Sequence, residues 1–111
     1  MNNREATCRE HVRIPAQFRS HFSTKSRVVA GDGVLMDLSP GGCRIISPTG
    51  VSLGAELELC VFPGDEAHPC TIDAATVRWV RNREFGVAFS KIRAGAQRKI
   101  ILLWRKRMQA V

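Results

Sequence analysis

Short segments of alternating apolar and polar residues fill most of the first 90 positions of the chain. The clearest alternation spans Ala55–Phe62, which places Leu57 and Leu59 on one face and Glu56 and Glu58 on the other. Residues that favour turns separate this segment from the next ones. The pattern predicts a half-buried strand within a small β-sandwich or β-barrel.

Further strands are expected wherever a short apolar run lies between two turn signals. These strands cover residues 16–22, 34–38, 43–46, 70–80 and 85–89, and the turns that delimit them fall at residues 31–33, 39–42, 47–50 and 81–84. Pro40 and Gly41 suit the two central positions of a type II turn, and Gly42 leaves room for a close backbone approach. Connections this short predict antiparallel neighbours.

The pattern changes after Lys91. Residues 94–110 contain no proline and many strong helix formers, so they are predicted to form a C-terminal helix. An apolar belt from Ile100 to Trp104 is expected to cover an open end of the barrel. This belt is wider than one helix face needs, so the helix is also a candidate homodimer contact.

The composition fits one soluble domain of 111 residues, since 44% of them are hydrophobic. No stretch reaches the roughly 18 apolar residues of a membrane span, and the polar first 13 residues do not resemble a signal peptide. The four cysteines show no C-x-x-C spacing and no neighbouring histidine at a metal-ligand offset. We therefore expect a reduced cytoplasmic protein without a metal site or a membrane span.

The net charge of +7 is distributed unevenly along the chain. Residues 1–30 carry six basic and two acidic side chains, residues 31–90 four basic and eight acidic ones, and residues 91–111 seven basic and none acidic. Cationic ends of this kind suit an anionic ligand, a nucleic acid or an acidic membrane surface. Basic termini that are only solvated are equally common.

Motifs of the common enzyme classes are absent from the sequence. It contains no phosphate-binding G-x-x-x-x-G-K-[ST] loop, no G-x-G-x-x-G, no H-E-x-x-H and no G-x-S-x-G. His11, His21 and His68 lie in polar segments that nothing links to a nucleophile. We therefore predict no catalytic residues, no cofactor and no enzymatic activity.

Two short motifs could bind a ligand. The first is R-x-x-x-R, formed by Arg9 and Arg13 in the polar segment before the first strand. Guanidinium groups match both phosphate oxygens and the O6/N7 edge of guanine. Taken alone, two such arginines are typical of ordinary surface charge.

The second motif is D-x-S-x-x-G, formed by Asp37, Ser39 and Gly42 at the end of a predicted strand. A carboxylate can accept hydrogen bonds from N1 and N2 of guanine, and a hydroxyl with free backbone N–H groups can bind its other edge or a phosphate. Taken alone, the motif is typical of a hairpin turn.

The combination of these motifs resembles the PilZ domain family. R-x-x-x-R lies near the N-terminus, D-x-S-x-x-G follows between strands, and Trp79 precedes a G-x-x-F sequence at residues 86–89. The resemblance covers nearly the whole chain from Arg9. It implies a mainly β fold, a six-stranded antiparallel β-barrel (residues 16–111) with a C-terminal helix (about 94–110), preceded by a flexible N-terminal arm (residues 1–15).

The resemblance also implies a function, the binding of the bacterial second messenger cyclic di-GMP on the outer surface of the barrel. The expected ligand-binding residues are Arg9, Arg13, Asp37, Ser39 and Gly42, with Arg44 and Trp79 as further candidates. A tryptophan on a strand is more often part of the core, so Trp79 is a candidate for either role. The helix residues Arg105 and Arg107 are expected to lie outside this pocket. The signal would be relayed when the arm becomes ordered and a surface seen by a downstream protein changes.

The chain departs from the family pattern around Arg9. Cys8 supplies no additional guanidinium, which favours a single bound ligand, and Glu10 places a negative charge near the phosphates. Two alternatives stay open, namely a PilZ-like protein-interaction module that binds no nucleotide and a small basic barrel that binds RNA or single-stranded DNA. Nucleic acid is the less favoured partner, because five Phe, two Trp and no Tyr offer few rings for base stacking.

Overall fold

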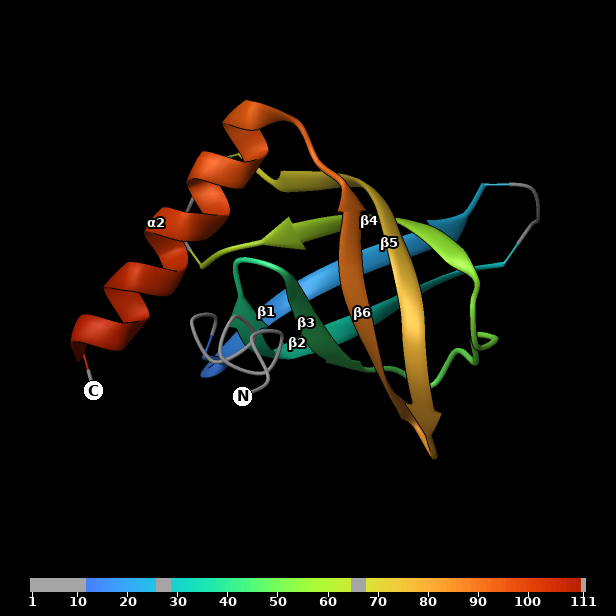
Figure 1. The fold of residues 1–111 in the computed structure, drawn as a ribbon. Helices are drawn as coiled ribbons and strands as arrows, with labels where there is room; N and C mark the ends of the chain where they lie inside the picture. Colours follow the sequence, from blue (N-terminus) through green and yellow to red (C-terminus); the bar gives the residue numbers. More distant parts are fainter. Residues whose placement is uncertain (1–11, 26–28, 65–67, 111) are drawn as a thin grey trace, which may run out of the picture.

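The chain forms a closed barrel of six antiparallel strands with one helix across its end (Figure 1), as the sequence predicts. The computed structural model describes residues 12–25, 29–64 and 68–110. The elements are β1 (Ile14–Thr24), β2 (Ala30–Ser39), β3 (Gly42–Ile46), β4 (Glu56–Phe62), β5 (Cys70–Arg81), β6 (Glu84–Lys91) and α2 (Ala94–Ala110). Arg9 and most of the expected N-terminal arm lie outside the described residues.

The strands follow the order β1-β2-β3-β6-β5-β4 around the barrel, and β4 pairs with β1 to close it. Short hairpins join β1 to β2, β2 to β3, β4 to β5 and β5 to β6. The pairing of β3 with β6 joins segments about 40 residues apart in the sequence. This pairing brings the end of the D-x-S-x-x-G motif beside β6, the strand that contains the G-x-x-F sequence.

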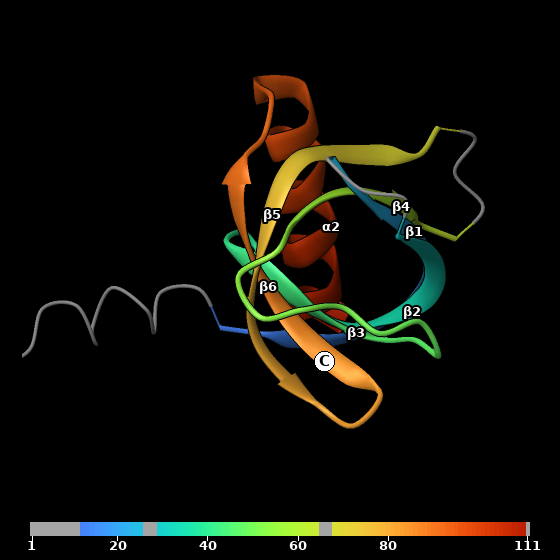
Figure 2. The same cartoon turned by 90° about the vertical axis from the view of Figure 1, so that its right-hand side faces the viewer.

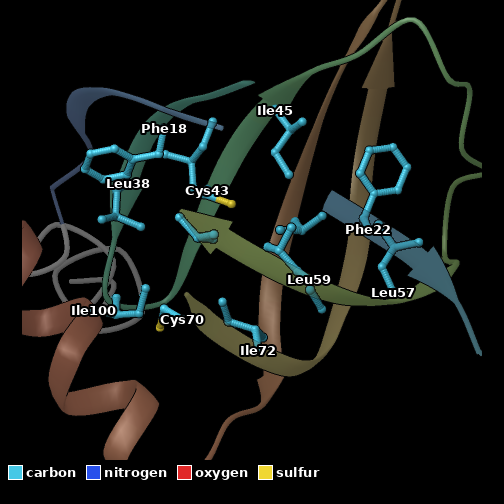
Figure 3. Packing of buried hydrophobic residues seen from close by; sticks show 14 of the residues in the cluster. Phe18, Phe22, Leu38, Cys43, Ile45, Leu57, Leu59, Cys70, Ile72 and Ile100 are labelled. Carbon is cyan, nitrogen blue, oxygen red and sulfur yellow. The ribbon is translucent and has the colours of Figure 1, made fainter. Parts of the chain in front are cut away.

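Inward-facing side chains fill the barrel (Figure 3). The alternation that the sequence predicts in β4 is confirmed, since Leu57, Leu59 and Val61 are fully buried while Glu56 and Glu58 are exposed. Apolar side chains from every strand meet in one cluster. The barrel therefore encloses a packed core and leaves its outer face as the available binding surface.

Helix α2 packs across the end of the barrel (Figures 1 and 2), against β1, β2 and β5. Ile100 is fully buried in the barrel core, and Leu103 packs on that core. Leu102 points away and stays 58% exposed, so only part of the apolar belt covers the barrel. Homodimer formation through this helix stays a prediction. No helix in the described ranges is long and apolar enough to cross a membrane.

The turn expected at residues 31–33 is wrong, because both glycines belong to β2. Gly31 pairs with Phe22 and lies under Thr49, whose side-chain oxygen would be only 2.5 Å from an added Cβ atom. A Cβ atom added to Gly33 would lie 2.7 Å from the carbonyl oxygen of Ile46. These glycines allow close packing within the barrel instead of reversing the chain.

The turn expected at residues 39–42 is confirmed, but its type II conformation is wrong. Residue i+2 of a type II turn needs a positive φ, and the described glycines with positive φ are Gly54 and Gly64, not Gly41. Proline at the first central position is also common in type I turns, which need no positive φ.

Candidate ligand-binding site

A single row of paired residues crosses the outer face of five strands. Pro15 on β1 pairs with Asp37 on β2, Asp37 pairs with Arg44 on β3, Arg44 pairs with Gly86 on β6, and Gly86 pairs with Trp79 on β5. The register thus places three residues predicted from separate parts of the sequence on one line.

Asp37 is the centre of a chain of ion pairs. Its Oδ1 accepts from Nη1 of Arg13 at 3.2 Å, and its Oδ2 accepts from Nε of Arg44 at 2.8 Å. Arg44 also donates through Nη1 to Oε1 of Glu84 at 3.1 Å. The hydrogen bond to Asp37 is the main reason that the pKa of Arg44 is raised, so this guanidinium stays charged.

Glu84 also belongs to this series of ion pairs, although the sequence did not identify it as a site residue. It lies two residues before Gly86 on the same face of β6, beside the pair of Gly86 and Arg44. No local pattern marked Glu84 as a ligand-binding residue, because it lies in the predicted turn at residues 81–84 and outside both motifs. It joins Arg44 through the pairing of β3 with β6, which links residues 40 positions apart.

A bulge in β2 shapes the region around Asp37. Leu35 pairs with Ile45 and Asp37 with Arg44, so Met36 is an extra residue without a partner on β3. Such a bulge re-aims the side chains beside it. Here Leu35 and Leu38 both remain buried while Asp37 turns to the outer face, where its side chain is 18% exposed.

Ser39 and Gly42 build the turn that follows Asp37. The Ser39 hydroxyl accepts from the backbone N–H of Gly41 and donates to the carbonyl of Gly42, both at 3.3 Å, and the residue is 4% exposed. A Cβ atom on Gly42 would overlap the carbonyl oxygen of Val87 on β6. Both residues therefore have a structural function, which fixes the turn next to Asp37.

Trp79 lies flat over Gly86 at the end of the paired row. A Cβ atom on Gly86 would overlap the Nε1 atom of the indole, so this contact needs glycine. The guanidinium of Arg81 lies over the Trp79 ring, with its Cζ atom 5.7 Å from the ring centroid. Trp79 is half-buried, which makes it a packed element of the outer face that keeps some accessible ring.

A hollow of about 590 Å³ opens beside Arg44. Its lining residues are Pro15, Ala16, Gln17, Met36, Arg44 and Arg107. The expectation that Arg107 lies apart from the site residues is wrong, because Arg107 and Arg44 line the same hollow. The cause is the packing of α2, which brings its last turns against β1 and places Arg107 over Phe18, 5.1 Å from the ring centroid.

A second hollow, of about 500 Å³, lies at the start of α2 and does not adjoin this row. Its basic groups already have partners, because Arg93 pairs with Asp73 at 3.0 Å and Lys99 donates to the carbonyl of His68 at 3.1 Å. Glu58 and Asp73 also line this hollow, so its two acidic and two basic side chains balance and it has no excess positive charge for an anion.

The chain segment just before Arg13 is attached to α2. Nε1 of Trp104 donates to the carbonyl oxygen of Val12 at 2.6 Å. This hydrogen bond joins residues 92 positions apart. It links the end of the R-x-x-x-R motif to the C-terminal helix.

The described residues include no group of three His, Cys, Asp or Glu that could hold a metal ion. Three cysteines in the described ranges are free, namely Cys43, Cys60 and Cys70. Burial raises the pKa of the Cys43 and Cys70 thiols, which keeps both in the neutral, unreactive form. The residues that the structure does bring together are the arginines, carboxylates and turn described above.

Comparison with known proteins agrees with this geometry. The sequence pattern of the PilZ domain matches residues 8–104. A comparison with curated proteins finds no match.

Several solved structures share the fold. The Bacillus subtilis inhibitor of motility MotI/DgrA superposes with a TM-score of 0.74 at 21% identity over 91% of this chain, and this chain spans 51% of its length. The PilZ domain of Escherichia coli YcgR, solved with c-di-GMP, gives a TM-score of 0.71 at 13% identity, covering 90% of this chain and 91% of that one. The PilZ domain of CeSA from a cellulose-synthesising bacterium gives 0.68 at 18% identity, covering 86% and 96%. At these identities the likeness establishes the fold.

Proposed function

Because this chain belongs to the PilZ domain family, we propose that it is a non-catalytic receptor that binds cyclic di-GMP on the outer face of its barrel. The proposed ligand-binding residues are Arg9, Arg13, Asp37, Ser39 and Gly42, with Arg44 and Trp79 as further members. The observation that carries the proposal is that Arg13 and Arg44 both lie within hydrogen-bond distance of Asp37. The three residues come from the segment before β1, from β2 and from β3, and they include members of both motifs. A cytoplasmic location follows from the proposed ligand, an intracellular messenger.

Asp37 is suited to reading a guanine base. An ionised carboxylate offers about four lone-pair sites, and the bonds from Arg13 and Arg44 use one on each oxygen. The remaining sites can accept from N1–H and N2–H of one guanine at the same time. The two arginines keep the carboxylate ionised and oriented, so that the base meets a prepared acceptor pair.

Arg13 is suited to the phosphates of the ligand. Its side chain is 41% exposed and uses Nη1 for Asp37. The other guanidinium N–H groups remain available to phosphate oxygens or to the O6/N7 edge of guanine. Arg9 would add a second guanidinium from the part of the arm outside the described residues.

The turn after Asp37 and the Trp79 side chain would shape the binding surface. Ser39 and Gly42 hold the backbone of the turn and so fix the position of Asp37 beside it. A second base could stack on the Trp79 ring, at the far end of the row, by taking the place of the Arg81 guanidinium.

The signal would be relayed through the arm. The expected arm of residues 1–15 ends before Ile14, because Ile14 and Pro15 belong to β1. We propose that the ligand orders the arm ahead of this strand and that the bond between Trp104 and Val12 passes this change to α2, where a downstream protein would detect it. Amide exchange in residues 4–13 should then slow when cyclic di-GMP is added. Unchanged exchange at saturating ligand would contradict the relay but not the binding.

The direct test is a calorimetric titration with cyclic di-GMP and, separately, with a random single-stranded oligonucleotide, each at low and high salt. Cyclic di-GMP binding should survive the higher salt. Arg13→Ala should weaken it by about 2 to 5 kcal/mol if the contact is desolvated, and Arg13→Lys nearly as much, since lysine retains the charge but not the planar fork. The control is Arg83→Ala, which removes an exposed arginine at the tip of the β5–β6 hairpin.

The outcomes separate the three functions. Binding of the dinucleotide that depends on Arg13 supports the receptor. Salt-sensitive binding of the oligonucleotide alone would establish the nucleic-acid alternative. Binding of neither would leave the protein-interaction module.

A further inference from the structure

We propose that Arg107 of helix α2 is a further arginine of the ligand site and binds a phosphate group of the cyclic dinucleotide. This inference rests on the proposed function and adds a residue outside both sequence motifs. It makes the end of the helix one wall of the binding site.

The position of Arg107 supports this assignment. Together with Arg44 it lines the hollow of about 590 Å³ between β1, β2 and α2. Pro15, which pairs with Asp37 in the row across the barrel, also lines this hollow. A ligand that occupies this hollow therefore meets both Arg44 and Arg107.

The orientation of the Arg107 side chain favours a phosphate. Its guanidinium lies over the Phe18 ring, with Cζ 5.1 Å from the ring centroid. This cation–π contact holds the guanidinium without using its N–H donors, which stay available to an anion. No carboxylate pairs with Arg107 among the residues that the structure describes. The group is thus held in place without being neutralised.

The charge balance of the site also supports a phosphate-binding role for Arg107. Arg13 and Arg44 face the carboxylates of Asp37 and Glu84, so these four groups balance. Arg107 gives the described part of the site a net positive charge. A ligand with two phosphates needs such an excess, and Arg107 supplies it at a position that the strands alone cannot reach.

The assignment has a consequence for the relay. Arg107 and Trp104 lie one turn apart on α2, and Trp104 already holds Val12. A ligand held by both Arg13 and Arg107 would join the arm to the helix a second time. The position of α2 would then report directly whether the site is occupied.

The test compares Arg107→Met with Arg105→Ala by calorimetric titration with cyclic di-GMP. Methionine keeps an aliphatic side chain over Phe18 but removes the guanidinium. Arg105 is the matched control, because it carries the same charge two residues away and is exposed on the same helix. We expect Arg107→Met to weaken binding about tenfold or more, as for the loss of a hydrogen bond to a charged group, with the loss retained at high salt. Arg105→Ala should change the affinity less than about twofold and only at low salt, since its effect is long-range and screened.

Equal effects of Arg107→Met and Arg105→Ala, while Arg13→Ala abolishes binding, would overturn the inference and leave the proposed function intact. If the unaltered protein binds no cyclic di-GMP, both fail together. Thermal unfolding of each variant separates a lost contact from a lost fold. If Arg107→Met does not fold, Arg107→Lys provides the same comparison, since it retains the stem and the charge but not the planar fork.

Discussion

Replacing Asp37 by asparagine keeps the shape of this side chain but removes its charge, and this change distinguishes recognition of guanine from general attraction of anions. Asp37→Asn makes the site more positive by one unit, because Arg13, Arg44 and Arg107 keep their charges. A surface that only attracts anions would therefore bind the dinucleotide as tightly as before or more tightly. A site that reads guanine through the carboxylate would bind it more weakly, because the amide NH₂ group cannot accept a hydrogen bond.

The structure sets the size of both effects. A hydrogen bond to a charged group contributes about 1.5 to 3 kcal/mol, so losing one acceptor of the pair should weaken binding about tenfold to more than a hundredfold. The folded state loses the ion pairs to Arg13 and Arg44, at 3.2 and 2.8 Å, which lie at the surface or partly buried. We expect a loss of unfolding free energy of about 1 to 2 kcal/mol, too small to unfold a typical domain.

Calorimetric titration with cyclic di-GMP gives the affinity, and urea denaturation gives the stability. Asp32→Asn is the matched control, because Asp32 is an exposed carboxylate on the same strand that pairs with His21 away from the site. It should leave the affinity nearly unchanged. Unchanged or tighter binding by Asp37→Asn would refute the idea that this carboxylate reads the base.

Three further predictions concern the scaffold. Ile100→Ala should lower the free energy of unfolding by about 2 to 5 kcal/mol, because it opens a cavity in the core. Leu102→Ala, at a 58% exposed position, should lower it by less than about 1 kcal/mol. Similar losses for both variants in urea denaturation would contradict the packing of α2. Trp104→Phe removes the hydrogen bond to Val12 at a cost of about 1 kcal/mol, and amide exchange next to Val12 should accelerate; unchanged exchange would show that this bond does not hold the segment. The stability should fall as the pH rises above the ordinary thiol pKa of 9.0, because burial raises the pKa of Cys43 in the folded state and only the unfolded chain then releases that proton. This thiol contributes a slope of up to about 1.4 kcal/mol per pH unit, and a slope that is the same in Cys43→Ala would disprove its assignment.

Local sequence patterns predict most of the barrel and the helix. The alternation of Leu57, Leu59 and Val61 with glutamates fixes which face of β4 is buried, since a strand places successive side chains on opposite faces. Residues 94–110 are rich in strong helix formers, and this composition predicts α2 over its full length. The two motifs identify Arg13 and Asp37, whose chemistry suits a guanine nucleotide whatever the fold. These features depend on neighbours in the sequence, and so the sequence determined them.

The tertiary structure alone decided how these parts meet. Gly31 and Gly33 resemble a turn locally, yet they lie within β2 because Thr49 and the backbone of Ile46 pack against them. Glu84 joins the site through the pairing of β3 with β6, and Arg107 joins it through the packing of α2 on β1. Contacts of this kind depend on strand register and helix placement, which are set by burial summed over the whole barrel. No local pattern carries that information, so the last members of the site became visible only when the chain was folded.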